Sequence, residues 1–194
     1  MDTQLILKNV SRFITLTDEE RDYFVSIMRP RTYRKRQYVV QAGDVCKYEN
    51  FVTKGCLRSY FVDDNGFEHI LQFAIEDWWI GDMASFITQT PAMLNVEAVE
   101  DTDLIQILKA DLDALFDKYP KFDRFYRELI QKSMVTQQKR ILSNISLTAE
   151  QRYIAFRSQY AFLEQRLPQN YIASYLGITP EFLSKIRKKI ATTG

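Results

Sequence analysis

The stretch "YIASYLGITPEFLSKIRKKI", which spans Tyr171–Ile190, has the spacing of two short helices around a tight turn. Ala173 stands four residues before Gly177. A small residue lets the second helix cross closely, and glycine accepts the left-handed conformation of the turn. Thr179 can cap the second helix, and Pro180 suits its first position. The stretch therefore predicts a helix-turn-helix.

The second helix of this hairpin presents polar and basic side chains to solvent, as a DNA-reading helix does. Such a helix uses its N-terminal half for base edges and its flanks for phosphates. Lys185 can donate to guanine O6 or N7, and Glu181 can accept from cytosine N4. We expect the remaining DNA contacts from other polar residues of the region: Gln169, Asn170, Thr179, Arg187, Lys188 and Lys189. The alternative, a helical hairpin with a solvated basic face, stays open on the motif alone.

Charge is unevenly distributed along the chain, although the net charge is only +1. Residues 146–194 carry seven Lys or Arg residues against three Glu residues, a net +4, so residues 1–145 carry −3. A basic end on a slightly acidic body predicts an anionic partner at the C-terminus.

Composition excludes several classes of protein. The 194 residues are 46% hydrophobic, enough for a folded core in one or two domains. The sequence contains no run of about 18 apolar residues, so it predicts no membrane span. The stretch "MDTQLILKNVSRF" lacks the pattern of a signal peptide. Cys46 and Cys56 are too few for a disulfide framework or an iron–sulfur ligand set. A cytoplasmic protein without a metal or other cofactor is the simplest interpretation.

The region between Tyr33 and Ile107 reads as a series of short strands. It is rich in Val, Ile, Phe and Tyr, and "DDNG" at 63–66 is a strong hairpin signal. Many short strands at this spacing predict an antiparallel β-roll, jelly-roll-like, within an α+β fold. The expected strands are Tyr38–Val40, Tyr48–Thr53, Leu57–Val62, Glu68–Phe73, Trp78–Ile80, Asn95–Glu100 and Leu104–Leu108.

Helices flank this roll. A capping box at 17–20 opens a helix expected to run through Met28, and another helix is expected over Asp111–Tyr119. A long helix at 120–145 carries an apolar stripe and has spare surface for a second copy of itself. A second capping box, Thr148 with Gln151, opens a helix through Arg152–Phe162. We therefore expect three parts: a β-roll at 1–119, a dimerisation helix at 120–145, and a DNA-binding domain at 146–194.

In this order of elements the chain resembles the Crp–Fnr family of bacterial transcription regulators, in a form common in Bacteroidetes-type bacteria. The similar stretches are "GDVCKYENFVTKGCLRSYFVDDNG", "WIGDM", "VEAVEDTDLIQI" and "IASYLGITPEFLSKIRKKI". The resemblance implies a cyclic-nucleotide-binding-like roll and a homodimer that binds an inverted-repeat operator. It places base reading on Pro180, Glu181, Ser184 and Lys185, and a phosphate contact on Thr179.

The chain departs from the family's nucleotide cassette. Cyclic-nucleotide binders of this family have Gly-Glu followed about ten residues later by an Arg that neutralises the cyclic phosphate. The corresponding pocket here would be formed by Gly81, Asp82, Met83, Ala92 and Met93, with no cation among them. We therefore expect that cyclic AMP does not control this protein. An unknown small-molecule effector stays open, and the single histidine, His69, is expected to be a surface or core residue of the roll.

Two further expectations concern the C-terminal region and its partners. The family often has a β-wing between Arg152 and Gln169, but "YAFLEQRLPQ" reads as helix or loop, so we expect the wing to be absent. Metal or triad chemistry lacks its residues, which argues against an enzyme. The remaining alternative is a sensor or interaction module whose helical end binds protein through Leu167, Tyr171, Tyr175 and Phe182. RNA polymerase would be a further partner of an activator, although no residue marks such a surface.

Overall fold

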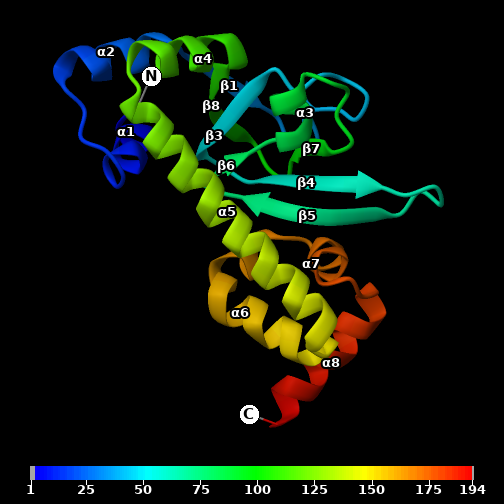
Figure 1. Cartoon of the computed structure of the whole chain (residues 1–194). Helices are drawn as coiled ribbons and strands as arrows, with labels where there is room; N and C mark the ends of the chain where they lie inside the picture. Colours follow the sequence, from blue (N-terminus) through cyan, green and yellow to red (C-terminus); the bar gives the residue numbers. More distant parts are fainter. Residues whose placement is uncertain (1–2, 194) are drawn as a thin grey trace. The chain divides into compact units, whose positions relative to one another are not determined.

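The fold is an antiparallel β-roll followed by helices, as the strand and helix patterns predicted (Figure 1). The computed structural model describes residues 3–193. One four-stranded sheet has the order β1 (Met28–Tyr33), β8 (Thr102–Leu108), β3 (Tyr48–Lys54), β6 (Trp79–Ile80). The other has the order β2 (Tyr38–Val40), β7 (Asn95–Ala98), β4 (Leu57–Val62), β5 (Glu68–Ala74). The helices are α1 (Gln4–Ser11), α2 (Asp18–Ser26), α3 (Met83–Thr88), α4 (Lys109–Lys118), α5 (Lys121–Ser146), α6 (Ala149–Arg166), α7 (Gln169–Leu176) and α8 (Pro180–Thr193).

Apolar side chains of both sheets form the core of the roll. Leu57, Val96 and Ala98 come from one sheet, and Val52 and Leu104 from the other, and all are buried. Neighbouring strands pair antiparallel, so alternate residues of each strand turn to the same side and the apolar set reaches the core together.

The first strand corrects a prediction about where the first capped helix ends. The expected helix through Met28 ends at Ser26, and Met28–Tyr33 is strand β1. The sequence signal against this strand is Pro30, which cannot donate to a ladder. Because β1 lies at the edge of its sheet and pairs only with β8, Pro30 interrupts no pairing on its free side.

Two helices were not expected from the sequence. Helix α1 buries Ile6 and Val10 in the core of the roll, and its Asn9 donates to the main-chain and side-chain oxygens of Asp77 at 3.1 and 2.8 Å. The short helix α3 begins at Met83 after an Asp82 cap. A four-residue repeat of buried residues, Ile6 and Val10, was the available signal for α1. Helix α3 has fewer than two turns and gives no clear period.

Two of the expected helices begin at their predicted capping boxes, whereas the helix expected over Asp111–Tyr119 begins at Lys109 without a side-chain cap. The Thr17–Glu20 capping box opens α2, and the reciprocal bonds of Thr148 and Gln151 open α6. Helix α5 has 26 residues, or about 39 Å, and Phe122 and Phe125 in its first turns are buried in the core of the roll.

The chain divides into two compact units. The first contains residues 1–61 and 71–131, and the second contains residues 62–70 and 132–194. The tip of the β4–β5 hairpin therefore belongs to the same unit as the C-terminal helices. The three-part division at residues 119/120 and 145/146 stays a prediction.

Candidate nucleic-acid interface and pocket

Helices α7 and α8 form the helix-turn-helix that the terminal sequence predicted. Gly177 closes α7 with φ +66°, in the left-handed region, and the Ile178 amide donates to Ala173 O at 3.0 Å. Ala173 is fully buried, which lets the second helix cross at close range. The other buried residues at the crossing are Ile172, Leu176, Leu183 and Ile186. Ile178, the residue after the turn glycine, is half-buried.

The first turn of α8 is held by Thr179 and leaves Glu181 in solvent. Thr179 Oγ1 accepts from the Phe182 amide at 3.2 Å, the expected cap. Hydrogen bonds from the Glu181 amide and then from Thr179 lower the pKa of the Glu181 carboxyl. The carboxylate is thus ionised at neutral pH and able to accept a hydrogen bond.

The basic residues of α8 fall into two groups. Lys185 and Lys188 are exposed, and neither forms an ion pair with any residue between 3 and 193. Lys189 Nζ lies 2.6 Å from Glu150 Oε2, and Arg187 lies 3.9 Å from Glu164 Oε1. An amine already paired within the protein must give up that partner to bind a phosphate. Lys185 and Lys188 therefore have the stronger electrostatic case for DNA contact.

The remaining predicted contacts lie at the helix starts and along α8. Gln169 and Asn170 are exposed at the beginning of α7, Pro180 is exposed at the beginning of α8, and Ser184 is half-buried. The same unit thus contains all ten predicted DNA-contact residues. Of the alternative protein-binding residues, Leu167 is buried and Tyr171 and Tyr175 are half-buried, whereas Phe182 is 48% exposed.

No strand occurs between α5 and α7 in the described chain, so the β-wing is absent there, as expected. Helix α6 occupies the region instead and is kinked at Tyr160, with φ −132° and ψ 38°. Glu164, after the kink, binds Arg157 at 3.1 Å and accepts a short hydrogen bond from Tyr153, before the kink. Burial, and then this hydrogen bond, raises the pKa of Tyr153 to about 12.

The hairpin segment 62–70 makes specific contacts with α7 and the second half of α5. Ser174 Oγ donates to Glu68 O at 2.6 Å and accepts from the Ile70 amide at 3.0 Å. Arg140 donates to Ile70 O at 2.6 Å and to Tyr175 O at 3.0 Å, and its guanidinium lies 4.1 Å from the Tyr175 ring centre. Strand β5 is an edge strand, so these side chains satisfy backbone groups that no neighbouring strand pairs. His69, between the two bonded residues, is exposed and lies 2.8 Å from Asp63.

The residues at the cassette position lie close together, and the carboxylate of Asp82 is hydrogen-bonded within the protein. Asp82 is 4% exposed, and its carboxylate accepts from the amides of Ser85, Met93 and Leu94 at 3.0, 2.9 and 3.0 Å. Two of these bonds join Asp82, which lies between Gly81 and Met83, to Met93 and Leu94, which follow Ala92. A sugar hydroxyl bound at Asp82 would have to displace backbone donors. No described residue supplies a cation at the position of the missing arginine.

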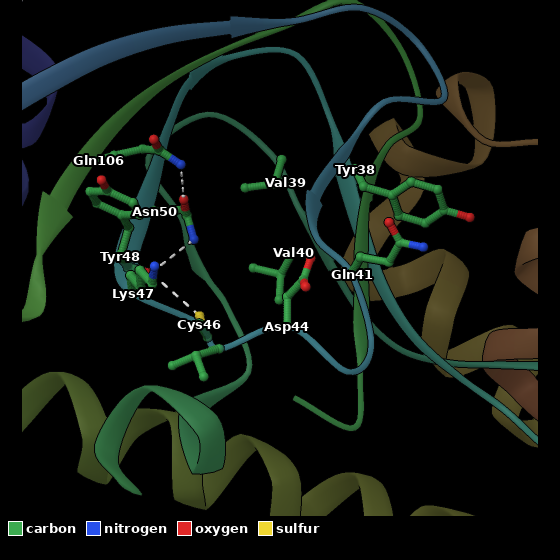
Figure 2. A pocket seen from close by; sticks show the side chains of 11 residues that line it. Tyr38, Val39, Val40, Gln41, Asp44, Cys46, Lys47, Tyr48, Asn50 and Gln106 are labelled. Carbon is green, nitrogen blue, oxygen red and sulfur yellow. Dashed lines mark hydrogen bonds between the residues drawn. The ribbon is translucent and has the colours of Figure 1, made fainter. Parts of the chain in front are cut away.

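A pocket of about 530 Å³ lies elsewhere in the roll (Figure 2). It is lined by β2, the loop after it, the beginning of β3, and Gln106 of β8, and by none of the five predicted pocket residues. Asn50 and Gln106 are a cross-strand pair, and Gln106 Nε2 donates to Asn50 Oδ1 at 2.7 Å. A Cβ added to Gly81 would lie 3.7 Å from Cys46 Sγ, so the pocket wall adjoins the cassette position.

Sequence reasoning missed the residues of this pocket. The available signal was a buried amide within each of two apolar strands, Asn50 in "YENFVTK" and Gln106 in "TDLIQIL". Burial raises the pKa of the Cys46 thiol in the same wall, which keeps it neutral. Among residues 3–193 no His, Cys, Asp and Glu cluster suited to a metal was found, and no helix there is both long and apolar enough to cross a bilayer.

Comparisons with known proteins agree with this architecture. The family described as "Cyclic nucleotide-binding domain" matches residues 30–119. The chain is 27% identical to the Anaerobic regulatory protein of Haemophilus influenzae over 93% of this chain and 74% of that protein. It is 24% identical to the Transcriptional activator protein anr of Pseudomonas aeruginosa, over 93% of this chain and 78% of that protein.

Solved structures share the fold. FixK2 from Bradyrhizobium japonicum superposes with a TM-score of 0.77 at 19% identity, covering 87% of this chain and 86% of that one. A protein from Eubacterium rectale, described as a regulator of the Crp–Fnr family, has a TM-score of 0.72 at 17% identity, covering 92% and 85%. In its roll, long helix and terminal helix-turn-helix, and in its likeness to these relatives, the chain is similar to transcriptional regulators of the Crp–Fnr family.

Proposed function

We propose that this regulator binds an inverted-repeat DNA operator as a homodimer and inserts α8 of each subunit into the major groove. The observation that carries the proposal is the free cationic face of α8. Lys185 and Lys188 are exposed on a helix whose opposite side, with Leu183 and Ile186, is buried, so the helix is oriented with its cations outward. Half-sites are expected about 10 bp, or roughly 34 Å, apart. Because the ligand is chromosomal DNA, we place the protein in the cytoplasm.

The second half of α5 supports the homodimer. From residue 131 to 139 every side chain is exposed, and five large apolar side chains of the helix are left to solvent: Met134, Val135, Ile141, Leu142 and Ile145. Met134 and Ile141 are seven residues apart, and so are Val135 and Leu142, which is the repeat of a coiled-coil seam. A second copy of the same helix is the occupant that fits this repeat.

Cyclic AMP is not expected to be the effector. The Asp82 carboxylate is occupied by three backbone amides, and Ala92 and Met93 supply no charge. An anionic phosphate held there would lack a counter-charge, and desolvating an unpaired charge is costly.

The test is selection of bound DNA from a random pool by the purified full-length protein, with and without cyclic AMP. Enrichment of an inverted repeat in both arms supports the proposal. Enrichment only with cyclic AMP contradicts the cyclic-AMP-independent part. If neither arm enriches DNA, sequence-specific binding by the protein as purified is refuted, and capture of protein through the helical end becomes the alternative to measure.

Base reading and phosphate contact are separable by substitution. Lys185→Ala is expected to cost about 1–3 kcal/mol of operator binding and to relax specificity at one base position. Lys188→Ala is expected to weaken all sequences alike and to lower the salt slope of binding by about one unit. Glu181→Ala is expected to relax a second base position. Binding to a set of single-base operator variants across a salt series measures all three effects. A uniform loss for Lys185→Ala would reassign that residue to the backbone.

A further inference from the structure

The pocket in the roll has the size and the kind of wall expected of a ligand site. Its volume of about 530 Å³ lies within the range of small-molecule pockets. Val39, Val40 and Val45 supply an apolar wall, and Tyr48 adds a ring. The lining excludes Gly81, Asp82, Met83, Ala92 and Met93, although Cys46 in the pocket wall adjoins the cassette position.

Two buried amides in the lining have unequal hydrogen bonding. Both polar atoms of the Asn50 side chain are hydrogen-bonded. Its Nδ2 donates to Ile80 O and Tyr48 O, and its Oδ1 accepts from Gln106. Gln106 is 5% exposed, and its Nε2 donates to Asn50 and to Tyr33 Oη. Its Oε1 accepts no hydrogen bond from residues 3–193. Although the residue is largely buried, this oxygen is not itself sealed from solvent, so the lining offers a free acceptor to a ligand N–H or O–H group.

The rim of the pocket carries one charge of each sign. Asp44 and Lys47 line the pocket and are exposed, and neither side chain has a hydrogen bond or an ion pair with a described residue. In Figure 2 their side chains lie on opposite sides of Cys46. No arginine contributes to the lining, so a phosphate would meet a single exposed lysine and an opposing carboxylate. This charge pattern suits a ligand whose own charges cancel.

We propose that the pocket binds a free α-amino acid whose side chain carries a hydrogen-bond donor. The carboxylate of the ligand pairs with Lys47, its ammonium group pairs with Asp44, and its side-chain N–H or O–H donates to Gln106 Oε1. The three valines cover the aliphatic part of the ligand. The inference goes beyond DNA binding, because it assigns an effector class to the roll.

The experiment is titration calorimetry of the full-length protein without DNA, using L-glutamine, L-asparagine, L-serine and L-threonine as probes. L-Norleucine is the matched probe, since it keeps both main-chain charges and lacks a side-chain donor. Saturable binding of at least one donor-bearing probe, about tenfold or more tighter than norleucine, is the expected result. Cyclic AMP should not compete.

Variants locate the binding. Asp44→Asn and Lys47→Gln change exposed side chains that bind nothing else in the described chain, so the fold should be retained while affinity falls about tenfold or more. Gln106→Met should remove the preference over norleucine. Lys8→Gln, an exposed lysine of α1 outside the pocket, is the control and should bind as the wild type does.

Three outcomes would overturn the inference. They are no saturable binding of any of the four probes up to about 10 mM, affinity unchanged in both rim variants, and displacement of the amino acid by cyclic AMP. The titration contains no DNA, so a negative titration would say nothing against operator binding. Likewise, a negative DNA selection would not change the interpretation of the titration.

Discussion

Glu49 is a buried acidic residue of the roll with a raised pKa. It lies on β3, is 4% exposed, and accepts a hydrogen bond from Tyr126 on α5 at 2.5 Å. Burial raises the pKa of the Glu49 carboxyl to about 7, against a smaller lowering by the tyrosine hydrogen bond. The same burial, together with the nearby carboxylate, raises the pKa of the Tyr126 phenol.

The raised pKa of Glu49 gives the stability of the roll a defined pH dependence. The folded state holds the proton more tightly than the unfolded state, so this contribution is fully present below about pH 4.5 and is lost as pH rises through about 7. The loss is on the order of 3 kcal/mol. Glu49→Gln should remove this dependence while an amide oxygen still accepts from Tyr126. Urea unfolding at pH 5 and pH 8, followed by fluorescence of Trp78 and Trp79 in the roll, measures it.

A matched control for this experiment lies on the helix that carries Tyr126. Glu128→Gln changes a half-buried glutamate of α5 that has no hydrogen bond or ion pair among the described residues. It should keep the wild-type difference between the two pH values. An equal difference in Glu49→Gln would show that another group causes the pH dependence.

At the scale of elements, Gly177 decides whether α7 and α8 can form a hairpin. Its φ is +66°, and an added Cβ would meet no atom within 4 Å. The cost of Gly177→Ala is therefore conformational, about 1–2 kcal/mol, with Gly177→Asn costing less. Hydrogen exchange in α7 and α8 should quicken accordingly.

The comparison variant is Gly55→Ala, also at positive φ. A Cβ there would lie 2.5 Å from Thr102 Oγ1 and 2.7 Å from Asp101 O. It should cost more than Gly177→Ala and should affect the roll rather than the hairpin. Equal effects of the two substitutions would contradict the role given to steric contact.

A separate prediction concerns the α5 seam, the exposed apolar residues Met134, Val135, Ile141, Leu142 and Ile145. Ile145 is 78% exposed within one chain, so Ile145→Glu should leave the monomer folded and place two like charges close together in a dimer. We expect dissociation to monomers, measured by sedimentation equilibrium. Thr136 lies nine residues earlier, on the opposite side of the helix, and Thr136→Glu should remain dimeric. A dimeric Ile145→Glu protein would exclude this seam.

At the scale of the whole molecule, a nine-residue hairpin segment belongs to the C-terminal unit. Residues 62–70 lie in the middle of the roll's sequence, yet Glu68 and Ile70 are bonded to Ser174 and Arg140. Strands β4 and β5 therefore begin in one unit and end in the other. The second unit is incomplete as a contiguous stretch of chain.

A fragment of residues 132–194 is accordingly expected to be less stable than the same residues in the full chain. It would lose three hydrogen bonds to the hairpin, each worth about 1 kcal/mol. Amide exchange in α7 should be faster in the fragment, and Ser174→Ala in the full chain should reproduce part of the change. Equal exchange rates in fragment and full chain would show that the hairpin adds nothing.

The sequence by itself determined the elements whose signals are local. Capping boxes at Thr17 and Thr148, the DDNG turn, and the spacing of Ala173 and Gly177 depend on neighbours a few residues away, so strand order along the chain and the terminal hairpin followed from them. For the segment where related proteins often have a wing, the sequence allowed helix or loop, and the structure has helix α6 there.

Only the tertiary structure decided which distant groups meet. Pro30 argued against a strand at Met28–Tyr33, because proline cannot donate to a β-ladder. The strand forms because β1 lies at the edge of its sheet, and the strand order of a sheet is known only from the tertiary structure. Three hydrogen bonds illustrate this. Gln106 donates to Asn50, 56 positions away, and the Met93 amide donates to Asp82, 11 positions away. The Ile70 amide of β5 donates to Ser174, 104 positions away. Hydrogen bonds at such separations depend on the folded path of the chain, and no local pattern encodes them.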